Sequence, residues 1–257
     1  MKKTLQIGNI LSVIWAITAN AIVSTSYGLP DIRLVSERSE TLLNPATYAF
    51  SIWTLIYLGI FILALYQARD FFSPDKHNTL PWQLSGWFML ANILNGLWTY
   101  IFISGYIALS VIIISTLLFS LMVLLWRLRI AIYDAAITTI SMVWWPLLLY
   151  TGWVLVATVV NTASLLAAWG FILSAPLAAT VIIALGISLS IFLEKRNVRL
   201  LVLGSVWGIA AVAVAQYGVT PTVWITAAGV SFLLLIHVCI HAYRKRATNP
   251  LVRLIRK

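Results

Sequence analysis

The chain has 257 residues, of which 61% are hydrophobic and 9% are charged, whereas about 25% of the residues are charged in an ordinary soluble domain. This composition excludes a soluble globular enzyme, a disordered chain and a secreted disulfide scaffold, and the one cysteine, Cys239, excludes an internal disulfide and a cysteine-based metal cluster. The net charge of +10 fits either nucleic-acid binding or an asymmetry across a membrane, and the positions of the basic residues distinguish the two.

Eight apolar runs are long enough to span a bilayer, which requires roughly 20 residues for about 30 Å of hydrocarbon. Their residues are apolar at consecutive positions, which favours helices over the alternating strands of a membrane β-barrel. The connections are short and hold nearly all of the charge. We therefore predict an all-α, polytopic integral membrane protein with eight transmembrane helices, at about residues 5–28, 48–68, 83–103, 106–126, 138–166, 176–193, 199–216 and 222–243.

The basic residues lie almost entirely on one side of the predicted membrane. With the N-terminus inside, fifteen of the 17 fall in inner segments, and only Arg33 and Arg38 fall in outer ones. Because cytoplasmic loops carry such an excess, we predict a protein of the cell (inner or plasma) membrane with cytoplasmic N- and C-termini and a basic cytoplasmic tail at residues 245–257. No basic face with interleaved aromatic residues remains, so we expect no nucleic-acid partner.

The N-terminal run has a second interpretation. Met1-Lys2-Lys3, the apolar stretch after it and Ala19-Asn20-Ala21 also fit a secretory signal peptide with a small-residue cleavage site. Cleavage after residues 1–21 would leave seven spans and an outer N-terminus. The length of the apolar region favours a retained helix, and both interpretations stay open.

Lysine and acidic residues are absent from the predicted membrane interior. No lysine lies inside a span, which excludes a retinal Schiff base, and the seven acidic residues lie in connections or at span ends. Ion relays and acid–base catalysis both need such groups, so we predict neither ion coupling nor any catalytic residue. His237 and His241 share a helix face that could hold a metal, but no third ligand is evident, and we predict interfacial histidines and no metal site.

Uncharged polar residues inside the runs are more informative, because an unpaired amide in an apolar run is costly. Such amides bond either between helices or to a ligand. Several lie beside aromatic residues at helical spacing, in the half of the membrane that the charge count makes the outer one. Flat aromatic walls with a few amides suit a flat, largely apolar ligand. The residues are Asn20 in the first span, Trp53 and Tyr57 in the second, Asn95 and Trp98 in the third, and Trp153, Ala157 and Asn161 in the fifth. Asn92, also in the third span, is a further amide within an apolar run.

Two further patterns bear on packing. An interfacial belt of tryptophans explains Trp82, Trp126 and Trp224, but it does not explain Trp15 or Trp153, which lie near the middle of their spans. The segment 204–208 (GSVWG) matches the small-xxx-small pattern, which predicts that the seventh span packs closely against a neighbour.

Three segments resemble motifs of the tryptophan-rich sensory protein family, also called the translocator protein (TspO/MBR, peripheral-type benzodiazepine receptor-like) family. In the second span, Pro45 followed by residues 50–57 (FSIWTLIY) resembles a proline and then F-x-x-V-W-T-x-L-Y. In the third, residues 94–102 (LNGLWTYIF) resemble L-N-x-x-W-x-x-x-F. In the fifth, residues 150–161 keep the spacing of Y-x-x-W-x-x-x-A-x-x-x-N. The three motifs occur in the family's order and on the corresponding helices.

The resemblance covers about residues 1–168 and implies a TspO-like five-helix membrane core. Three additional transmembrane helices at 169–244 follow it, outside the motifs. Family members bind tetrapyrroles such as protoporphyrin IX, and some bind sterols and aromatic drugs, in a pocket among helices 1, 2, 3 and 5 beneath the loop between helices 1 and 2. The resemblance therefore implies that this pocket is lined by Trp53, Tyr57, Asn95, Trp98, Trp153 and Asn161, to which the residue pattern adds Asn20 and Ala157.

The sequence thus predicts a binding or sensory membrane protein with a pocket for a flat hydrophobic ligand, tetrapyrrole- or isoprenoid-like. A carrier of such molecules without ion coupling is the alternative, and a porphyrin-degrading enzyme, to which Trp53 and Trp153 would contribute by resemblance, is favoured least. We expect no required cofactor, with porphyrin or haem as a ligand rather than a prosthetic group. The expected partners are the lipid bilayer and a hydrophobic small molecule, and homodimer formation is left open.

Overall fold

The computed structural model describes residues 1–25, 41–71 and 78–246. The predicted outer connection with Arg33 and Arg38, which by resemblance would cover the pocket, lies outside the described residues. So does the predicted basic tail from residue 247 onward.

Eight helices are long and apolar enough to cross a membrane, and the described ranges contain no strand, so the predicted fold class is confirmed. Short helical turns extend some of them: η1 (Thr47–Ser51) and η2 (Arg69–Phe71) flank α3, while α6 (Ile137–Thr139) and the π-helical η3 (Ile140–Trp144) lead into α7. The long helices are α1 (Lys2–Thr25), α3 (Ile52–Gln67), α4 (Leu80–Ile103), α5 (Ile107–Arg127), α7 (Trp145–Ala168), α8 (Ala175–Lys195), α9 (Arg199–Gln216) and α10 (Pro221–Arg244).

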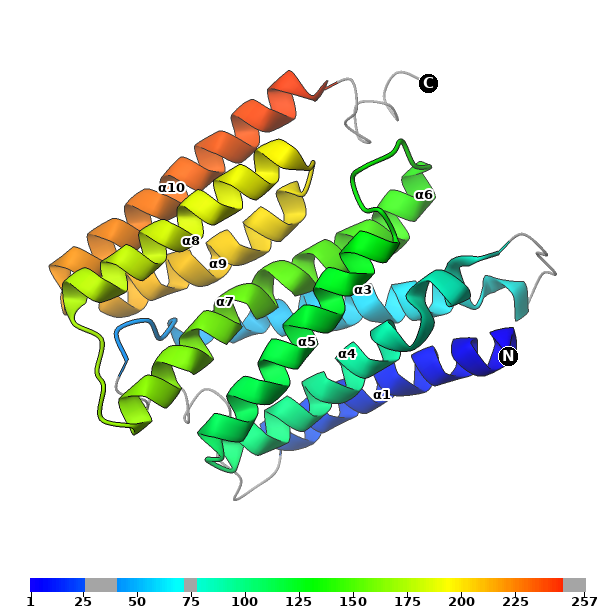
Figure 1. Cartoon of the computed structure of the whole chain (residues 1–257), viewed down its shortest axis with the longest axis horizontal. Coiled ribbons are helices and arrows are strands. Elements are labelled where there is room, and N and C mark those ends of the chain that lie inside the picture. The colour runs from blue at the N-terminus through cyan, green and yellow to red at the C-terminus, as the bar shows by residue number, and fades with distance from the viewer. Residues whose placement is uncertain (26–40, 72–77, 247–257) are drawn as a thin grey trace.

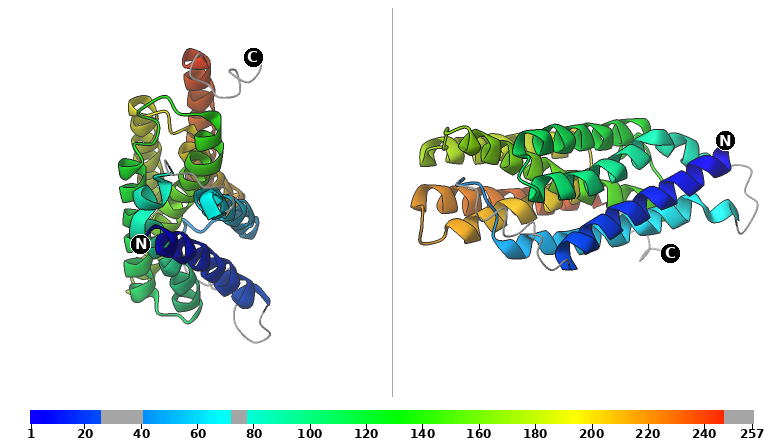
Figure 2. Two further views of the ribbon diagram at one scale, coloured as in Figure 1. Left: turned by 90° about the vertical axis from the view of Figure 1, so that its right-hand side faces the viewer. Right: turned by 90° about the horizontal axis from the view of Figure 1, so that it is seen from below.

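The helices form two groups that meet at α7 (Figure 1). In one group α1 packs on α4, α4 on α5 and α5 on α7, and α3 lies against α1 and α7. In the other, α9 packs on α7, α10 on α9, and α8 on α10. The views along and across the bundle show all eight helices running roughly side by side (Figure 2). The central helix α7 is accordingly the most buried of the eight, and the peripheral α10 is the least buried.

Large apolar side chains cover the outside of the bundle. Ile112 on α5 and Phe232 and Leu233 on α10 are each more than 60% exposed. A soluble monomer rarely exposes such continuous apolar surface, whereas lipid tails solvate it without cost. The surface therefore agrees with the span assignment by length and composition.

The contact between α7 and α9 is a close backbone approach, as the small-residue pattern at 204–208 predicts. A Cβ atom added at Gly152 of α7 would lie 2.1 Å from the carbonyl oxygen of Leu201 on α9. The hydroxyl of Ser205 donates a hydrogen bond to the carbonyl oxygen of Gly152 across the same contact (2.9 Å). Small residues thus let this pair of helices approach without intervening side chains.

One end of the bundle, which we call the basic end, holds the start of α1 and the end of α10 (Figure 1). Arg127, Lys195, Arg199 and Arg244 also lie at helix termini that meet at this end. The clustering on one side is what the charge count predicts, and the assignment of this side to the cytoplasm stays a prediction.

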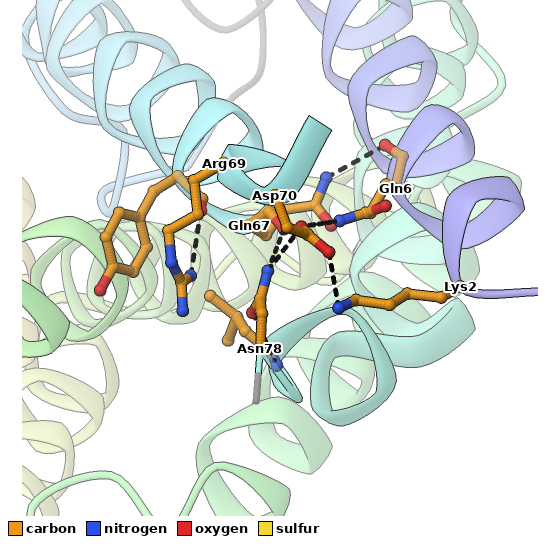
Figure 3. Close-up of polar contacts among 8 residues, drawn as sticks. Lys2, Gln6, Gln67, Arg69, Asp70 and Asn78 are labelled. Atoms are coloured by element: carbon orange, nitrogen blue, oxygen red, sulfur yellow. Dashed lines mark hydrogen bonds and ion pairs between the residues drawn. The ribbon is translucent and has the colours of Figure 1, made fainter. Parts of the chain in front are cut away.

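A polar cluster joins three helices at the basic end (Figure 3). The carboxylate of Asp70 in η2 pairs with the ammonium of Lys2 and accepts hydrogen bonds from the side-chain amides of Gln6 and Asn78. Gln6 and Gln67 also exchange bonds, each donating from its side-chain amide to the other's backbone carbonyl (3.1 and 3.0 Å). The cluster thereby fastens α1 to the end of α3 and to the start of α4.

Candidate functional site

Five aromatic side chains from α3, α4 and α7 pack together toward the end of the bundle opposite the basic end. We call Trp53, Tyr57, Trp98, Tyr150 and Trp153 the aromatic cluster. The Trp53 ring stacks on Tyr57 (5.4 Å between ring centroids) and lies 6.4, 6.1 and 6.2 Å from the rings of Trp98, Tyr150 and Trp153. Each separation is within the range of favourable aromatic pairing. Four of the residues were predicted as pocket residues, and Tyr150 belongs to the third motif.

Aromatic rings fill the space between α3 and α4. These two helices are not among the closely packed pairs of the bundle, although Trp53 and Tyr57 on α3 contact residues of α4. The spacing explains the arrangement, because positions i and i+4 of a helix project on the same face. A space held open by side chains, not closed by backbone contact, can be enlarged by rotamer changes.

Asn161 is a buried hydrogen-bonding centre of the site. Its side-chain carbonyl oxygen accepts one hydrogen bond from the Trp98 indole N–H (3.0 Å) and a second from the Ser110 hydroxyl (3.1 Å). Because an indole nitrogen can only donate, the atom of Asn161 that faces Trp98 must be the oxygen. The amide nitrogen of Asn161 is buried and has no hydrogen-bond partner in the described structure.

Asn95 is a second buried amide, on α4. Its side-chain carbonyl oxygen accepts a hydrogen bond from the Tyr57 hydroxyl (2.9 Å), and its amide group is within hydrogen-bonding reach of the Tyr150 hydroxyl. The indole nitrogens of Trp53 and Trp153 are buried and unpaired in the described structure. Buried N–H groups are normally paired, because leaving one unsatisfied costs about 1–3 kcal/mol. Together with the amide nitrogen of Asn161, the site therefore holds three unused donors, and it suits a ligand that brings acceptors.

A small cavity adjoins the cluster. It has a volume of about 30 Å³ and lies between Pro45 and Phe50 on one side and the helices α4 and α7 on the other. Trp153, Ala157 and Asn161 all line it, which confirms that their spacing places them on one face of α7. Pockets for small organic ligands are roughly 300–1,000 Å³, so this conformation has room for about one water molecule.

The segment before α3 closes the cavity and is held in place by α9. Trp207 donates from its indole nitrogen to the carbonyl oxygen of Ala49 (2.9 Å) and meets the Tyr48 ring edge-on at 5.4 Å. The backbone N–H of Ala46 donates to the carbonyl oxygen of Ala211 (3.0 Å). Residues 45–51, which we call the lid segment, are thus tied to a helix outside the predicted five-helix core. Sequence reasoning missed Trp207, for which the only signal was its place within the pattern at 204–208.

The remaining predicted residues lie apart from the aromatic cluster. Asn20 is half-buried on α1, and no hydrogen bond or ring contact in the described structure links it to the cluster. Asn92 donates to the Ser12 hydroxyl of α1 (3.4 Å), an interhelical role. Trp15 donates from its indole to the carbonyl oxygen of Ile93 (3.2 Å) and lies against Gly96, where a Cβ atom would come within 2.3 Å of the indole nitrogen. Trp15 therefore packs α1 onto α4.

A comparison with protein families agrees with this arrangement. The family model described as TSPO-like protein matches residues 6–240. The chain belongs to the TSPO-like protein family. It is therefore a multi-pass membrane protein, and the match continues through α8 and α9 into α10, beyond the residues 1–168 that the motifs cover. Neither a curated protein nor a solved structure matches the chain.

The Trp207 contact yields a first prediction. Trp207→Phe keeps an aromatic ring beside Tyr48 but removes the donor to Ala49, so it should lower stability by about 1 kcal/mol. Amide hydrogen exchange of the lid segment should rise, including the Ala46 amide that bonds to Ala211, while exchange within α7 should change little. Trp224→Phe is the matched control, because Trp224 contacts Tyr217 and makes no contact with the lid segment. Unchanged exchange in the lid segment would contradict the assignment.

Proposed function

We propose that this protein is a membrane binding or sensory protein whose aromatic cluster takes a flat, largely apolar ligand that carries hydrogen-bond acceptors. One observation carries the proposal: three buried N–H donors, on Trp53, Trp153 and Asn161, lie among aromatic faces without partners in the described structure. A tetrapyrrole with carboxylate side chains supplies both a flat apolar ring and acceptors. An isoprenoid hydrocarbon supplies only the apolar part, so this donor set favours the tetrapyrrole class.

Binding would require the site to open. The present cavity of about 30 Å³ is an order of magnitude smaller than a pocket for such a ligand. The lid segment is the natural moving part, because it contributes Pro45 and Phe50 to the cavity and is tied to α9 by two hydrogen bonds and one ring contact. A ligand that pairs these three donors would offset the loss of those lid contacts.

The test is a titration of the detergent-solubilised protein with protoporphyrin IX, followed by quenching of tryptophan fluorescence and by the shift of the porphyrin absorption band. Trp53→Phe and Trp153→Phe each keep a ring but remove a donor, and each should weaken binding about tenfold, as expected for a charge-assisted hydrogen bond. Trp126→Phe is the control, because Trp126 is 70% exposed at the end of α5. Affinity that is unchanged in both cluster variants would refute the proposed site.

Two further measurements separate binding from the other functions that the sequence suggested. A carrier would move porphyrin across vesicles that contain the purified protein, whereas a binding protein would retain it. An enzyme would convert bound porphyrin under illumination into a product with a new absorption spectrum. Binding without flux and without a product is the result that we expect.

A further inference from the structure

A second cavity lies at the basic end, away from the aromatic cluster. It has a volume of about 620 Å³, which is within the usual range of small-molecule pockets. We call it the basic cavity. Its walls come from residues 131–135 before α6, from η3 and α7, from the turn between α8 and α9, and from the last turns of α10.

Cations outnumber anions around the basic cavity. Its lining includes the carboxylates of Asp134 and Glu194 and four basic side chains: Lys195, Arg196, Arg199 and Lys245. The carboxylate of Glu194 already bonds to the Nε2 atom of His237 (2.7 Å) at the outer edge. The field inside the cavity is therefore positive and suits an anion.

Among the basic lining residues, Arg199 has a defined hydrogen-bond partner that fixes its orientation. Its Nε–H donates to the Nδ1 atom of His241 (3.2 Å), while its Nη2 atom is buried and has no hydrogen-bond partner in the described structure. His241 is 2% exposed, and because its Nδ1 accepts this bond, its neutral ring carries the proton on Nε2. Arginine and histidine, which both line the cavity, thus hold each other in position, and the Nη2 donor is enclosed behind the cavity wall. A planar guanidinium of this kind matches the oxygens of a phosphate group.

Part of the lining is apolar. The apolar lining residues include Trp144 of η3, Leu148 of α7, Leu200 and Leu203 of α9, and Val238 of α10. Free phosphate gains nothing from contact with an apolar surface, whereas a lipid would pack its acyl chains against it. Basic pockets between transmembrane helices, at the membrane surface, are suited to anionic lipid head groups.

We propose that the basic cavity binds a phosphate group, presented by an anionic phospholipid whose head group pairs with Arg199 and the neighbouring cations. The segment from the end of α8 to the residue after α10 supplies all of the charged lining residues except Asp134. The proposed lipid site therefore belongs mainly to the C-terminal part of the chain. The inference is independent of the aromatic cluster, which lies toward the other end of the bundle.

The experiment is calorimetric titration of the full-length protein in neutral detergent with dioctanoyl phosphatidic acid. Dioctanoyl phosphatidylcholine serves as the lipid without net charge, and inorganic phosphate serves as the head-group chemistry without acyl chains. We expect saturable binding of phosphatidic acid, binding at least about tenfold weaker for phosphatidylcholine, and weak competition by inorganic phosphate. Competition by phosphate at the same concentration as the lipid would assign the site to a soluble phosphate compound and overturn the lipid assignment.

Arg199→Gln should weaken phosphatidic acid binding about tenfold or more, because it removes both the charge and the planar guanidinium. Arg199→Lys keeps the charge but not the planar fork and should give an intermediate loss. Lys195→Gln, at the edge of the cavity, tests the site without touching the Arg199–His241 pair and should weaken binding about threefold. Lys3→Gln is the matched control, because it removes one charge from an exposed position of the same end and should change affinity less than twofold.

The outcomes separate a built site from general electrostatic attraction. Equal weakening by Lys3→Gln and Arg199→Gln, or the absence of saturable binding, would overturn the inference. Protoporphyrin titration of Arg199→Gln should give the affinity of the unmodified protein, so failure of the basic cavity and failure of the aromatic site are distinguishable.

Discussion

Gly152→Ala is expected to force α9 away from α7 and to lower the thermal stability of the detergent-solubilised protein markedly. The added Cβ atom would lie 2.1 Å from the carbonyl oxygen and 2.9 Å from the carbonyl carbon of Leu201. Both are backbone atoms, so no rotamer change relieves the overlap and the helices must separate. Overpacking of this kind costs about 1–3 kcal/mol, and loss of the hydrogen bond from Ser205 to Gly152 adds about 1 kcal/mol.

The matched control for this variant lies on the peripheral helix. Gly229 is in α10, and nothing lies within 4 Å of the position that its Cβ atom would occupy. Gly229→Ala should therefore be neutral or raise stability by up to about 1 kcal/mol, because alanine favours the helix. The measurement is the midpoint of thermal unfolding of both variants in the same detergent. Equal midpoints for the two variants would mean that α7 and α9 are not in close contact.

The effect of Gly152→Ala should reach the aromatic cluster. On α9, Gly208 lies against Trp153, since a Cβ atom there would be 3.5 Å from the indole ring. Trp207 and Ala211 of the same helix hold the lid segment. A displaced α9 should therefore loosen both, and porphyrin affinity should change together with stability, whereas Gly229→Ala should leave affinity unaltered.

Asp70→Ala is expected to release the basic end of α1 and to destabilise the protein by about 2 kcal/mol. The carboxylate accepts from Lys2, Gln6 and Asn78, and its side chain is 12% exposed (Figure 3). Removing it takes away one acceptor that the partly buried ammonium of Lys2 and the amides of Gln6 and Asn78 share, which is the costly way to break such a cluster. Asp70→Asn keeps one acceptor oxygen and should lose less.

Two lysine variants identify the ion pair within this cluster. Lys2→Gln should lower stability by about 1 kcal/mol, because Gln6 and Asn78 still bond to Asp70. Lys3→Gln, at the neighbouring exposed position, should have no measurable effect. Thermal unfolding and limited proteolysis near the N-terminus measure both. An unfolding midpoint of Asp70→Ala equal to that of Lys3→Gln would contradict the role assigned to the cluster.

Local patterns in the sequence were sufficient for the spans and for most of the aromatic site. A run of roughly 20 apolar residues has no stable alternative to a helix in lipid, so eight runs became eight helices. Trp53 and Tyr57, or Trp153 and Asn161, share a face by helical periodicity alone. Their meeting between α3, α4 and α7 was implied by the family motifs, and the structure brings them together.

Contacts between distant parts of the chain had no comparable signal. The bond between Trp207 and Ala49 joins residues separated by 158 positions, and the pair of Arg199 and His241 joins the start of one helix to the end of another. Such contacts depend on which helices are neighbours and how each is rotated. Periodicity gives little information on either, because the lipid-facing and the buried surfaces of these helices are both largely apolar.

The amino-acid sequence alone therefore established a membrane protein of eight helices, the end of the bundle that carries the basic residues, and the helix faces that carry the aromatic residues. These features are local, because the backbone of each span must form its own hydrogen bonds in lipid and because the helical repeat fixes which residues share a face. Only the tertiary structure decided that α9 supports the lid segment, that three donors of the aromatic site are left unpaired, and that four basic residues help to line a cavity of about 620 Å³. The physical reason is that hydrogen-bond pairing and cavity volume are properties of several helices packed together. Apolar helices in lipid can pack in many arrangements, and small residues and buried polar groups select one of them.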